Sequence, residues 1–238
     1  MTGGQSSALR EACEVGVSNP DALFESIRTG DYPAVAKALD EDPELVNARS
    51  ERGVSAALMA CYTGQAKIRD LLIDKGARLE LHEAVAAGKL AKVKEFADAK
   101  PELARSYSPD GFPMIALAAA FGHEDVARYL HEKGAEMNAL ATNGTGYNAL
   151  TGAVAGRHSS IAKWLVESGA DVNYRYAQGH SPFLEAAANG NLEIVKLLVA
   201  HGADVHSRTD AGKSALKFAQ EKGHQELVGY LQSLGLTS

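Results

Sequence analysis

One short segment of the sequence has the spacing of a nucleotide-binding loop. Residues 144–149 read Gly-Thr-Gly-Tyr-Asn-Ala and match the G-x-G-x-x-A pattern, in which glycines let the backbone approach a pyrophosphate. That chemistry requires a strand before the loop and a long helix after it, within a β–α–β unit. The repeat pattern described below instead places these residues in a loop between short helices. We therefore interpret the segment as turn chemistry.

Histidine and cysteine are the other side chains that could ligate a metal or act as a catalyst. His123, His158 and His224 recur at one phase of a repeat, which predicts a structural capping role at a helix end. No C-x-x-C or H-x-x-x-H spacing supports a zinc site. Cys61 falls at a phase that holds alanine in sibling repeats, which indicates a buried small side chain and not a nucleophile. We predict no catalytic residue, no metal ligand and no cofactor; His180, in a loop, is the one histidine that stands apart.

The composition is that of a globular chain in a reducing compartment. The 238 residues are 45% hydrophobic, which excludes an intrinsically disordered chain. The 24 Lys and Arg against 30 Asp and Glu leave a net charge of −6, which argues against a nucleic-acid partner. No segment approaches the ~20 apolar residues of a membrane span, and the first residues carry charges where a secretory signal needs an apolar run. With only Cys13 and Cys61 no disulfide framework is possible, so we expect a cytoplasmic protein that does not bind membranes.

Glycines recur with a period of 33 to 35 residues along most of the chain. Gly-Ala pairs stand at Gly76, Gly134, Gly169 and Gly202, and Gly235 continues the phase. A second glycine leads four of these by twelve residues, at Gly64, Gly122, Gly190 and Gly223, whereas Arg157 takes that place in one repeat. Only 24 residues separate Gly64 from Gly88, so one repeat has lost about ten residues.

Residues 179–206, GHSPFLEAAANGNLEIVKLLVAHGADVH, show the plan of one repeat most clearly. Ser181 suits a helix N-cap, Pro182 suits the first turn, and Gly190 suits the helix end. The second helix then carries an apolar stripe made of Ile194, Val195, Leu198 and Val199. Each repeat is thus helix, turn, helix and a hairpin-like loop, called a finger below.

Helices of eight to ten residues are marginal in water, so the repeats must gain stability by stacking against one another. We predict an all-α solenoid of about seven helix-turn-helix repeats over residues 20–238, in which the third repeat lacks its finger. Residues 1–19 are predicted as an N-terminal tail or short helix. The approximate repeat boundaries are 20–49, 50–78, 79–106, 107–138, 139–173, 174–206 and 207–238.

This pattern resembles the ankyrin repeat, which has about 33 residues and a T-P-L-H-x-A signature. The signature is degraded here, to Ser181-Pro182-Phe183-Leu184 in the sixth repeat and Leu79-Glu80-Leu81-His82 in the third. The phrases GHEDVARYLHEKGAEMN and LEIVKLLVAHGADVH fit the family better. The whole chain is similar to stand-alone ankyrin-repeat proteins of the bacterial type.

The resemblance implies a non-catalytic, monomeric protein-interaction module with a protein partner that the sequence does not identify. Ankyrin-repeat proteins generally bind partners through their finger tips and the exposed inner, concave face of the first helices. Carried onto this chain, the partner-binding residues are Tyr62, Tyr107, Asp110, Phe112, Phe121, Asn143, Tyr147, Arg175, Tyr176, Gln178, His180 and Asn189.

Five of these residues are aromatic and are expected to form one exposed patch in repeats four to six: Tyr107, Phe112, Phe121, Tyr147 and Tyr176. Aromatic side chains often anchor protein interfaces. The alternative for Phe112 and Tyr147 is that they pack under their own fingers.

A second function stays open at this stage. The aromatic patch would then bind a small molecule or serve an enzyme, with His180, Arg175 and Asn143 as its polar groups. Two further aromatic residues, Trp164 and Tyr129, share a second-helix phase and are expected to pack between repeats.

Overall fold

A computed structural model describes residues 19–237 of the chain, so the predicted short helix within residues 1–18 lies outside the described residues. The described residues form fourteen α-helices and three 3-10 helices and contain no β-strand, which confirms the all-α prediction. They divide into two compact units, one ending at Leu79 and the other beginning at Glu80. Each unit is described by itself.

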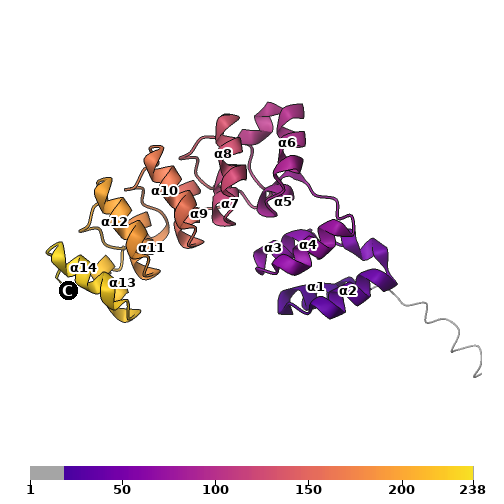
Figure 1. Cartoon of the computed structure of the whole chain (residues 1–238), viewed down its shortest axis with the longest axis horizontal. Helices are drawn as coiled ribbons and strands as arrows, with labels where there is room; N and C mark the ends of the chain where they lie inside the picture. Colours follow the sequence, from indigo (N-terminus) through magenta and orange to yellow (C-terminus); the bar gives the residue numbers. More distant parts are fainter. Residues whose placement is uncertain (1–18, 238) are drawn as a thin grey trace, which may run out of the picture. The chain divides into compact units, whose positions relative to one another are not determined.

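The first unit consists of two helix pairs around a small apolar core. Its elements are α1 (Pro20–Thr29), α2 (Tyr32–Glu41), the 3-10 helix η1 (Pro43–Asn47), α3 (Ala56–Tyr62) and α4 (Ala66–Asp74) (Figure 1). The core is formed by side chains such as Phe24, Ile27, Leu39, Ile68 and Leu72, each at most 2% exposed. Both pairs contribute to it, as expected for helices too short to be stable alone.

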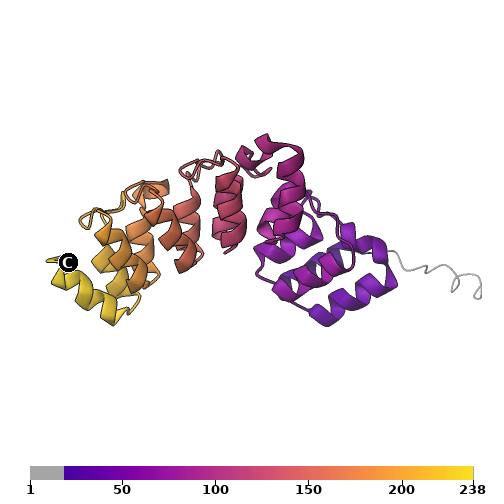
Figure 2. The ribbon, with the colours of Figure 1, turned by 45° about the horizontal axis from the view of Figure 1, so that its top comes forward.

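The second unit contains five consecutive helix pairs. Its elements are α5 (Leu81–Ala86), α6 (Leu90–Ala99), η2 (Pro101–Arg105), α7 (Met114–Ala120), α8 (Glu124–Glu132), α9 (Ala149–Ala155), α10 (Ser159–Glu167), η3 (Ala177–Gly179), α11 (Pro182–Ala188), α12 (Leu192–Ala200), α13 (Ala215–Glu221) and α14 (Gln225–Ser233). The first helices α5, α7, α9, α11 and α13 contact one another in that order (Figure 2). The second helices form another layer, in which α6 contacts α8 and α10 contacts α12.

The sixth pair confirms the local predictions. The Ser181 hydroxyl accepts the backbone N–H of Leu184 at 3.3 Å and caps α11, with Pro182 in the first turn. In α12 the predicted stripe is buried at Ile194, Val195 and Leu198, whereas Val199 remains partly exposed. Burying these side chains is what holds a nine-residue helix in place.

The first helices α7 and α9 approach each other closely because glycine stands at their contact. A Cβ added to Gly152 would lie 3.1 Å from the carbonyl oxygen of Ala116. A Cβ added to Gly156 would lie 2.6 Å from the carbonyl oxygen of Ala120, closer than packed atoms approach. The absence of side chains at these two positions therefore sets the spacing between these helices.

The three phased histidines cap helix ends in the neighbouring pair. The Nε2 atom of His158 lies 3.0 Å from the carbonyl oxygen of Ala120, the last residue of α7. His123 and His224 make the same contact with the last residues of α5 and α11, at 2.9 and 3.2 Å. Such terminal carbonyls have no partner within their own helix. The predicted capping role is confirmed, and the capped helix belongs to the preceding pair.

Polar and cationic contacts link the second helices of the second unit, as predicted for Trp164 and Tyr129. The guanidinium of Arg128 on α8 lies 4.7 Å from the centre of the Trp164 ring on α10. The Tyr129 hydroxyl on α8 donates a 2.9 Å hydrogen bond to Asp98 on α6. These contacts add to the apolar packing between successive pairs.

Candidate partner-binding surface

Each of four fingers is closed at its base by one isolated β-bridge between two backbone positions. The isolated bridges join Arg49 to Ser55, Tyr107 to Pro113, Tyr176 to His180 and Arg208 to Ser214. The predicted finger of the fifth repeat is closed differently, by a 2.7 Å hydrogen bond from the Ala141 N–H to the Tyr147 carbonyl. Between α4 and α5 the described chain has no such bridge, which agrees with the predicted loss of the third finger.

Neighbouring fingers of the second unit are joined edge to edge. The Thr142 N–H donates to the Gly111 carbonyl at 2.9 Å, and the Asn143 amide donates to the Asp110 carbonyl, also at 2.9 Å. The next finger continues the contact, because the Ala177 N–H faces the Thr145 carbonyl at 3.4 Å. These bonds fix the finger backbones relative to one another.

The last two fingers are joined in the same way. The Asp210 N–H donates to the Gln178 carbonyl at 3.0 Å, and the Arg175 guanidinium donates to the Arg208 carbonyl at 2.8 Å. The Arg175 guanidinium also lies 3.7 Å from the Asp210 carboxylate. Among the predicted site residues, Asp110, Asn143, Arg175 and Gln178 therefore all take part in contacts between fingers.

Residues 144–149 lie in the finger of the fifth repeat and in the first residue of α9. The Asn143 side-chain oxygen accepts the Thr145 N–H at 3.1 Å and the Thr145 hydroxyl at 2.7 Å, which forms a tight local turn. Gly144 and Gly146 have φ values of 84° and 69°. Asn148 then caps a helix of seven residues. The segment is a turn, as interpreted from the sequence.

The expectation that Tyr176 is exposed is wrong, because its side chain is only 8% exposed. Tyr176 occupies the finger phase that Ser50, Ser108 and Thr209 hold elsewhere. At those three positions the hydroxyl accepts the backbone N–H four residues further along, at 3.0 to 3.2 Å. A tyrosine cannot make that short contact, and its ring packs beneath the finger instead. Aligning the finger sequences on Ser50, Ser108 and Thr209 would have shown that Tyr176 occupies a structural position and not a finger tip.

Tyr176 belongs to a continuous row of rings, which we call the aromatic row: Tyr147, Tyr176, His180 and Phe218. Tyr147 meets Tyr176 edge-on, with centroids 5.1 Å apart and planes at 86°. The centroids of Tyr176 and His180 are 5.9 Å apart, and those of His180 and Phe218 are 5.8 Å apart. Such separations are those of favourable ring contacts. The row thus runs from the start of α9 to α13.

Phe218 was missed by the sequence reasoning, which ended the aromatic patch in the sixth repeat. Its signal was available, because Phe218 stands 33 residues after Glu185 and at the same phase of the first helix. The ring of Tyr147 contacts Tyr176 of the next finger and stays partly exposed, so this contact is not the predicted alternative of packing under its own finger.

The Glu185 carboxylate lies under the aromatic row. One of its oxygens accepts the Tyr176 hydroxyl at 3.3 Å and lies 3.7 Å from Nδ1 of His180. Burial, reinforced by the negative charge of Glu185, raises the pKa of the Tyr176 phenol far above its ordinary value. Burial, again with Glu185 as a smaller cause, also raises the pKa of Tyr147. Both phenols therefore stay neutral at physiological pH.

Five other predicted residues lie apart from the row. Phe112 and Phe121 flank α7 and are partly exposed. Tyr107 is 43% exposed at the start of its finger, and Tyr62, which belongs to the first unit, is 42% exposed. The Asn189 amide donates a 3.0 Å hydrogen bond to the Val154 carbonyl on α9, so this side chain joins successive first helices.

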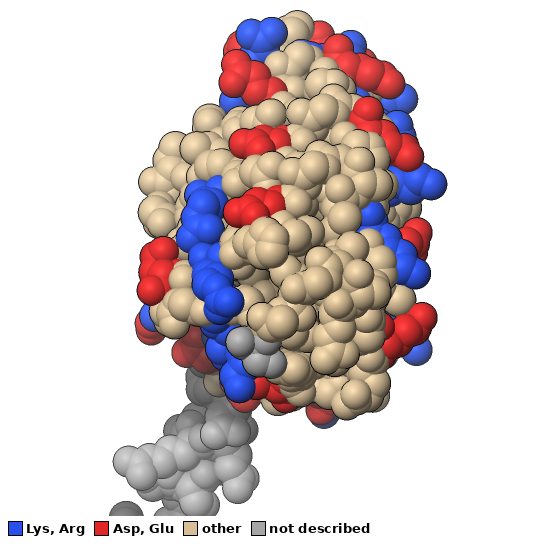
Figure 3. All heavy atoms as spheres, turned by 90° about the vertical axis from the view of Figure 1, so that its left-hand side faces the viewer, with Lys and Arg blue, Asp and Glu red and all other residues tan. Residues whose placement is uncertain are grey.

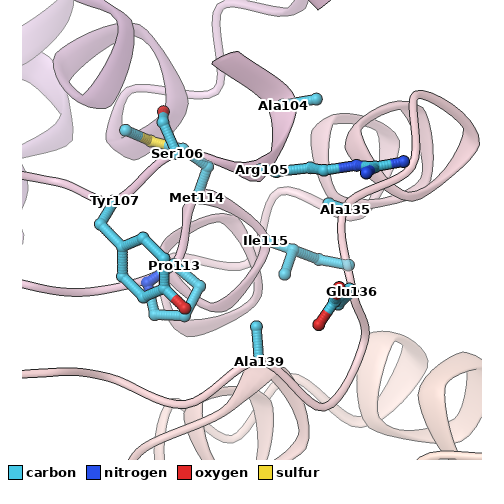
Figure 4. A pocket seen from close by; sticks show the side chains of 10 residues that line it. All are labelled: Ala104, Arg105, Ser106, Tyr107, Pro113, Met114, Ile115, Ala135, Glu136 and Ala139. Carbon is cyan, nitrogen blue, oxygen red and sulfur yellow. The ribbon is translucent and has the colours of Figure 1, made fainter. Parts of the chain in front are cut away.

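A cavity of about 110 Å³ opens beside Tyr107 (Figure 4). The Tyr107 and Pro113 rings form one wall, Met114 and Ile115 lie between, and the charged side chain of Arg105 points across the opposite side (Figure 4). It takes no more than a few non-hydrogen atoms, which is well below the size of a drug-like ligand site.

An arginine stands beside this cavity where other junctions carry an asparagine that bridges to the next repeat. Asn47 accepts the N–H of Arg78 at 2.9 Å, and Asn173 accepts the N–H of Asp204 at 2.8 Å, in each case 31 residues away. The same spacing sets Arg105 opposite Glu136. The Arg105 side chain extends along Gly134 instead and lines the cavity.

Lysines gather around one carboxylate at the end of the row. The Lys213 ammonium lies 2.6 Å from the Glu221 carboxylate and 4.9 Å from the centre of the Phe218 ring. Lys217 lies 4.0 Å from the same carboxylate. The hydrogen bond from Lys213, helped by the charges of Lys213, Lys217 and Lys222, lowers the pKa of Glu221.

The polar residues of the small-molecule hypothesis do not converge. Arg175 bonds to the Arg208 carbonyl, Asn143 bonds to the Asp110 carbonyl, and His180 faces Glu185. Cys61 is buried at 9% exposure on α3, as expected for a small apolar side chain. Within residues 19–237 no group of three or more His, Cys, Asp or Glu side chains is placed to hold a metal ion.

Comparison with known proteins gives a family and two relatives. A family model described as ankyrin repeats (3 copies) matches residues 81–176 and 174–236, which is more than half of the chain. The chain is 31% identical over 125 residues to the ankyrin repeat and SAM domain-containing protein 6 of Rattus norvegicus, and 32% identical over 125 residues to that of Mus musculus. These matches cover 52% of this chain and 11% of each relative. None of the helices in the described part of the chain is long and apolar enough to cross a membrane.

Proposed function

Because this chain belongs to the ankyrin-repeat family, whose members are generally protein-interaction modules, we propose that it is a non-catalytic module that binds a protein partner. The binding surface is the inner face of the second unit, meaning the side that the fingers and the first helices α7, α9, α11 and α13 present together. The observation that carries this proposal is the aromatic row, together with the partly exposed Phe112 and Phe121 that flank α7. The module acts as a monomer in the cytoplasm.

The linked fingers support the proposal through the entropy of binding. A loop that must be ordered when a partner docks reduces affinity. Here backbone bonds between fingers, such as those from Thr142 to Gly111 and from Asp210 to Gln178, order the loops beforehand. Partly exposed aromatic rings on such a fixed backbone are suited to anchor an interface.

The test compares two variants in capture from an extract of the native cells. Replacing Phe112 and Tyr147 together by Ala removes two partly exposed rings and leaves the buried Tyr176 in place. The matched control is Phe96→Ala, which removes a partly exposed ring from the second helix α6. Circular dichroism establishes that helicity is retained.

We expect the double variant to capture the partner at least tenfold less, with the control unchanged, as measured by mass spectrometry of the bound proteins. This magnitude follows from interface anchors that each contribute about 1 to 2 kcal/mol. Equal capture by the double variant and the native chain contradicts the assignment of this face.

A further inference from the structure

The charge on the inner face of the second unit changes sign along the row of first helices. The helices α7, α9 and α11 contain no Lys or Arg, and their single charged residue is Glu185. The fingers beside α7 and α9 add only Asp110 to that charge. At α13, by contrast, Lys213, Lys217 and Lys222 stand within ten residues of one another.

These three lysines form a local excess of positive charge. They are opposed by one carboxylate, Glu221, so two charges remain uncompensated at neutral pH. The space-filling view onto the end that carries α13 and α14 shows a column of Lys and Arg atoms, with Asp and Glu atoms on both sides of it (Figure 3). The whole chain carries a net charge of −6, so this cluster contrasts with the average surface.

The basic cluster is continuous with the aromatic row. Lys213 lies over the Phe218 ring and contacts Glu221, so both groups hold its ammonium on the inner face. Lys213 also stands at the finger phase of His180, and Lys222 at the first-helix phase of Asn189, each 33 residues on. A partner lying on the aromatic row therefore meets these cations at the end of the row.

We propose that the inner face binds a segment of a partner protein whose apolar side chains lie on the aromatic row and whose acidic side chains contact Lys213 and Lys222 there and Lys217 on the adjoining end of the stack. The proposal rests on the proposed function and specifies the partner's chemistry and direction. Glu185 and Asp110 disfavour acidic residues over α7 to α11. Arg175, the cation of the finger beside α11, already contacts the Arg208 carbonyl and the Asp210 carboxylate, so the acidic end of the segment lies at α13.

The geometry sets the spacing that such a segment needs. Two steps between adjacent helices, from α9 to α11 and on to α13, separate Tyr147 from the lysines. At about 8 to 10 Å a step the distance is about 18 Å. That length corresponds to about five or six residues of extended chain, or about twelve residues of helix.

The experiment uses the full chain and a displayed library of random peptides. Enriched peptides are synthesised with a fluorophore, and their Kd is measured by anisotropy. The charge variant is Lys217→Gln with Lys222→Gln, which leaves the Lys213–Glu221 ion pair and its packing intact. The matched control is Lys100→Gln with Lys163→Gln, which removes two exposed lysines, one just after α6 and one in α10, and changes the net charge equally.

We expect enriched peptides to carry acidic residues at the stated spacing from an aromatic or aliphatic residue. The charge variant should raise their Kd about fivefold, which is about 1 kcal/mol, while the control changes it less than twofold. Raising the salt concentration should weaken binding to the native chain more than to the charge variant, because salt screens exposed charges.

Three outcomes overturn the proposal. The first is enrichment of peptides without acidic residues; if the Phe112 and Tyr147 double variant still abolishes their binding, the proposed function stands and only the charge inference fails. The second is an equal effect of the charge variant and its control. The third is equally tight binding of a single-stranded oligonucleotide, which would mark a general anion surface. A library with no enriched peptide counts against both proposals.

Discussion

Adding one methyl group at each of three glycines separates helix propensity from packing. A Cβ at Gly229 in α14 meets nothing within 4 Å, so Gly229→Ala should gain about 0.5 to 1 kcal/mol from backbone entropy alone. At Gly156 a Cβ would lie 2.6 Å from the Ala120 carbonyl, which belongs to the α7 backbone. Relieving such an overlap costs about 1 to 3 kcal/mol, more than the entropy gain. We therefore expect Gly156→Ala to destabilise the protein by about 1 to 2 kcal/mol.

Gly152 tests the balance between these two effects. Its added Cβ would meet the Ala116 carbonyl at 3.1 Å, a contact that a shift of a few tenths of an ångström relieves. Gly152→Ala should consequently change the stability by less than 0.5 kcal/mol in either direction, as an order-of-magnitude balance of gain and strain.

Guanidinium unfolding followed by circular dichroism measures the three midpoints, and an unchanged m-value shows that stability alone has changed. Hydrogen exchange should show lost protection at α7 and α9 in Gly156→Ala only. A Gly156→Ala protein as stable as Gly229→Ala would refute the claim that close backbone approach sets the spacing of α7 and α9.

Two further predictions concern single positions. Arg157 has φ 62° in an exposed position, so Arg157→Gly should stabilise the protein by about 1 kcal/mol in guanidinium unfolding; no gain would mean that the strain is relieved elsewhere. Hydrogen bonds from Lys133 and Lys213 are the chief causes that lower the pKa values of Asp98 and Glu221, respectively. The contribution of each carboxylate to the stability of the fold is therefore present above its ordinary pKa of 3.8 or 4.5, and it is lost as the pH falls through the lowered pKa. Thermal unfolding at pH 7 and pH 3 should show a smaller acid-induced loss in Asp98→Asn, and an identical loss would contradict the assignment.

Local structure could be predicted from the sequence because it depends on neighbours in the chain. Ser181 and Pro182 predicted the start of α11, and Ile194, Val195 and Leu198 predicted the buried side of α12. Predicting these features requires only the residue type at the N-cap and first turn and the 3.6-residue period of the apolar side chains. The recurrence of His123, His158 and His224 likewise predicted a structural role.

Contacts between repeats could not be predicted in the same way. Each histidine caps a carbonyl of the preceding helix pair. Which carbonyl it reaches depends on how the two pairs are aligned, and no pattern of neighbouring residues gives that alignment. The same holds for the course of the Arg105 side chain, which stands where Asn47 and Asn173 bridge to a residue 31 positions away. The sequence analysis did not single out Gly156, because the need for glycine there comes from the close approach of the Ala120 carbonyl, which the sequence does not reveal.

The candidate site was predicted only in part, because the phase of a residue within its repeat does not determine its exposure. Tyr176 shares the phase of hydroxyl residues that close a finger, and so its ring is buried although it lies in a loop. Lys217 shares the phase of Leu184, which is fully buried because α13 covers it, whereas the side chain of Lys217 is 55% exposed. In a stacked protein the next repeat decides whether a side chain is core or surface. The chemistry offered to a partner is therefore set by departures from the repeat, such as Phe218 and the lysines around Glu221, more than by the repeat itself.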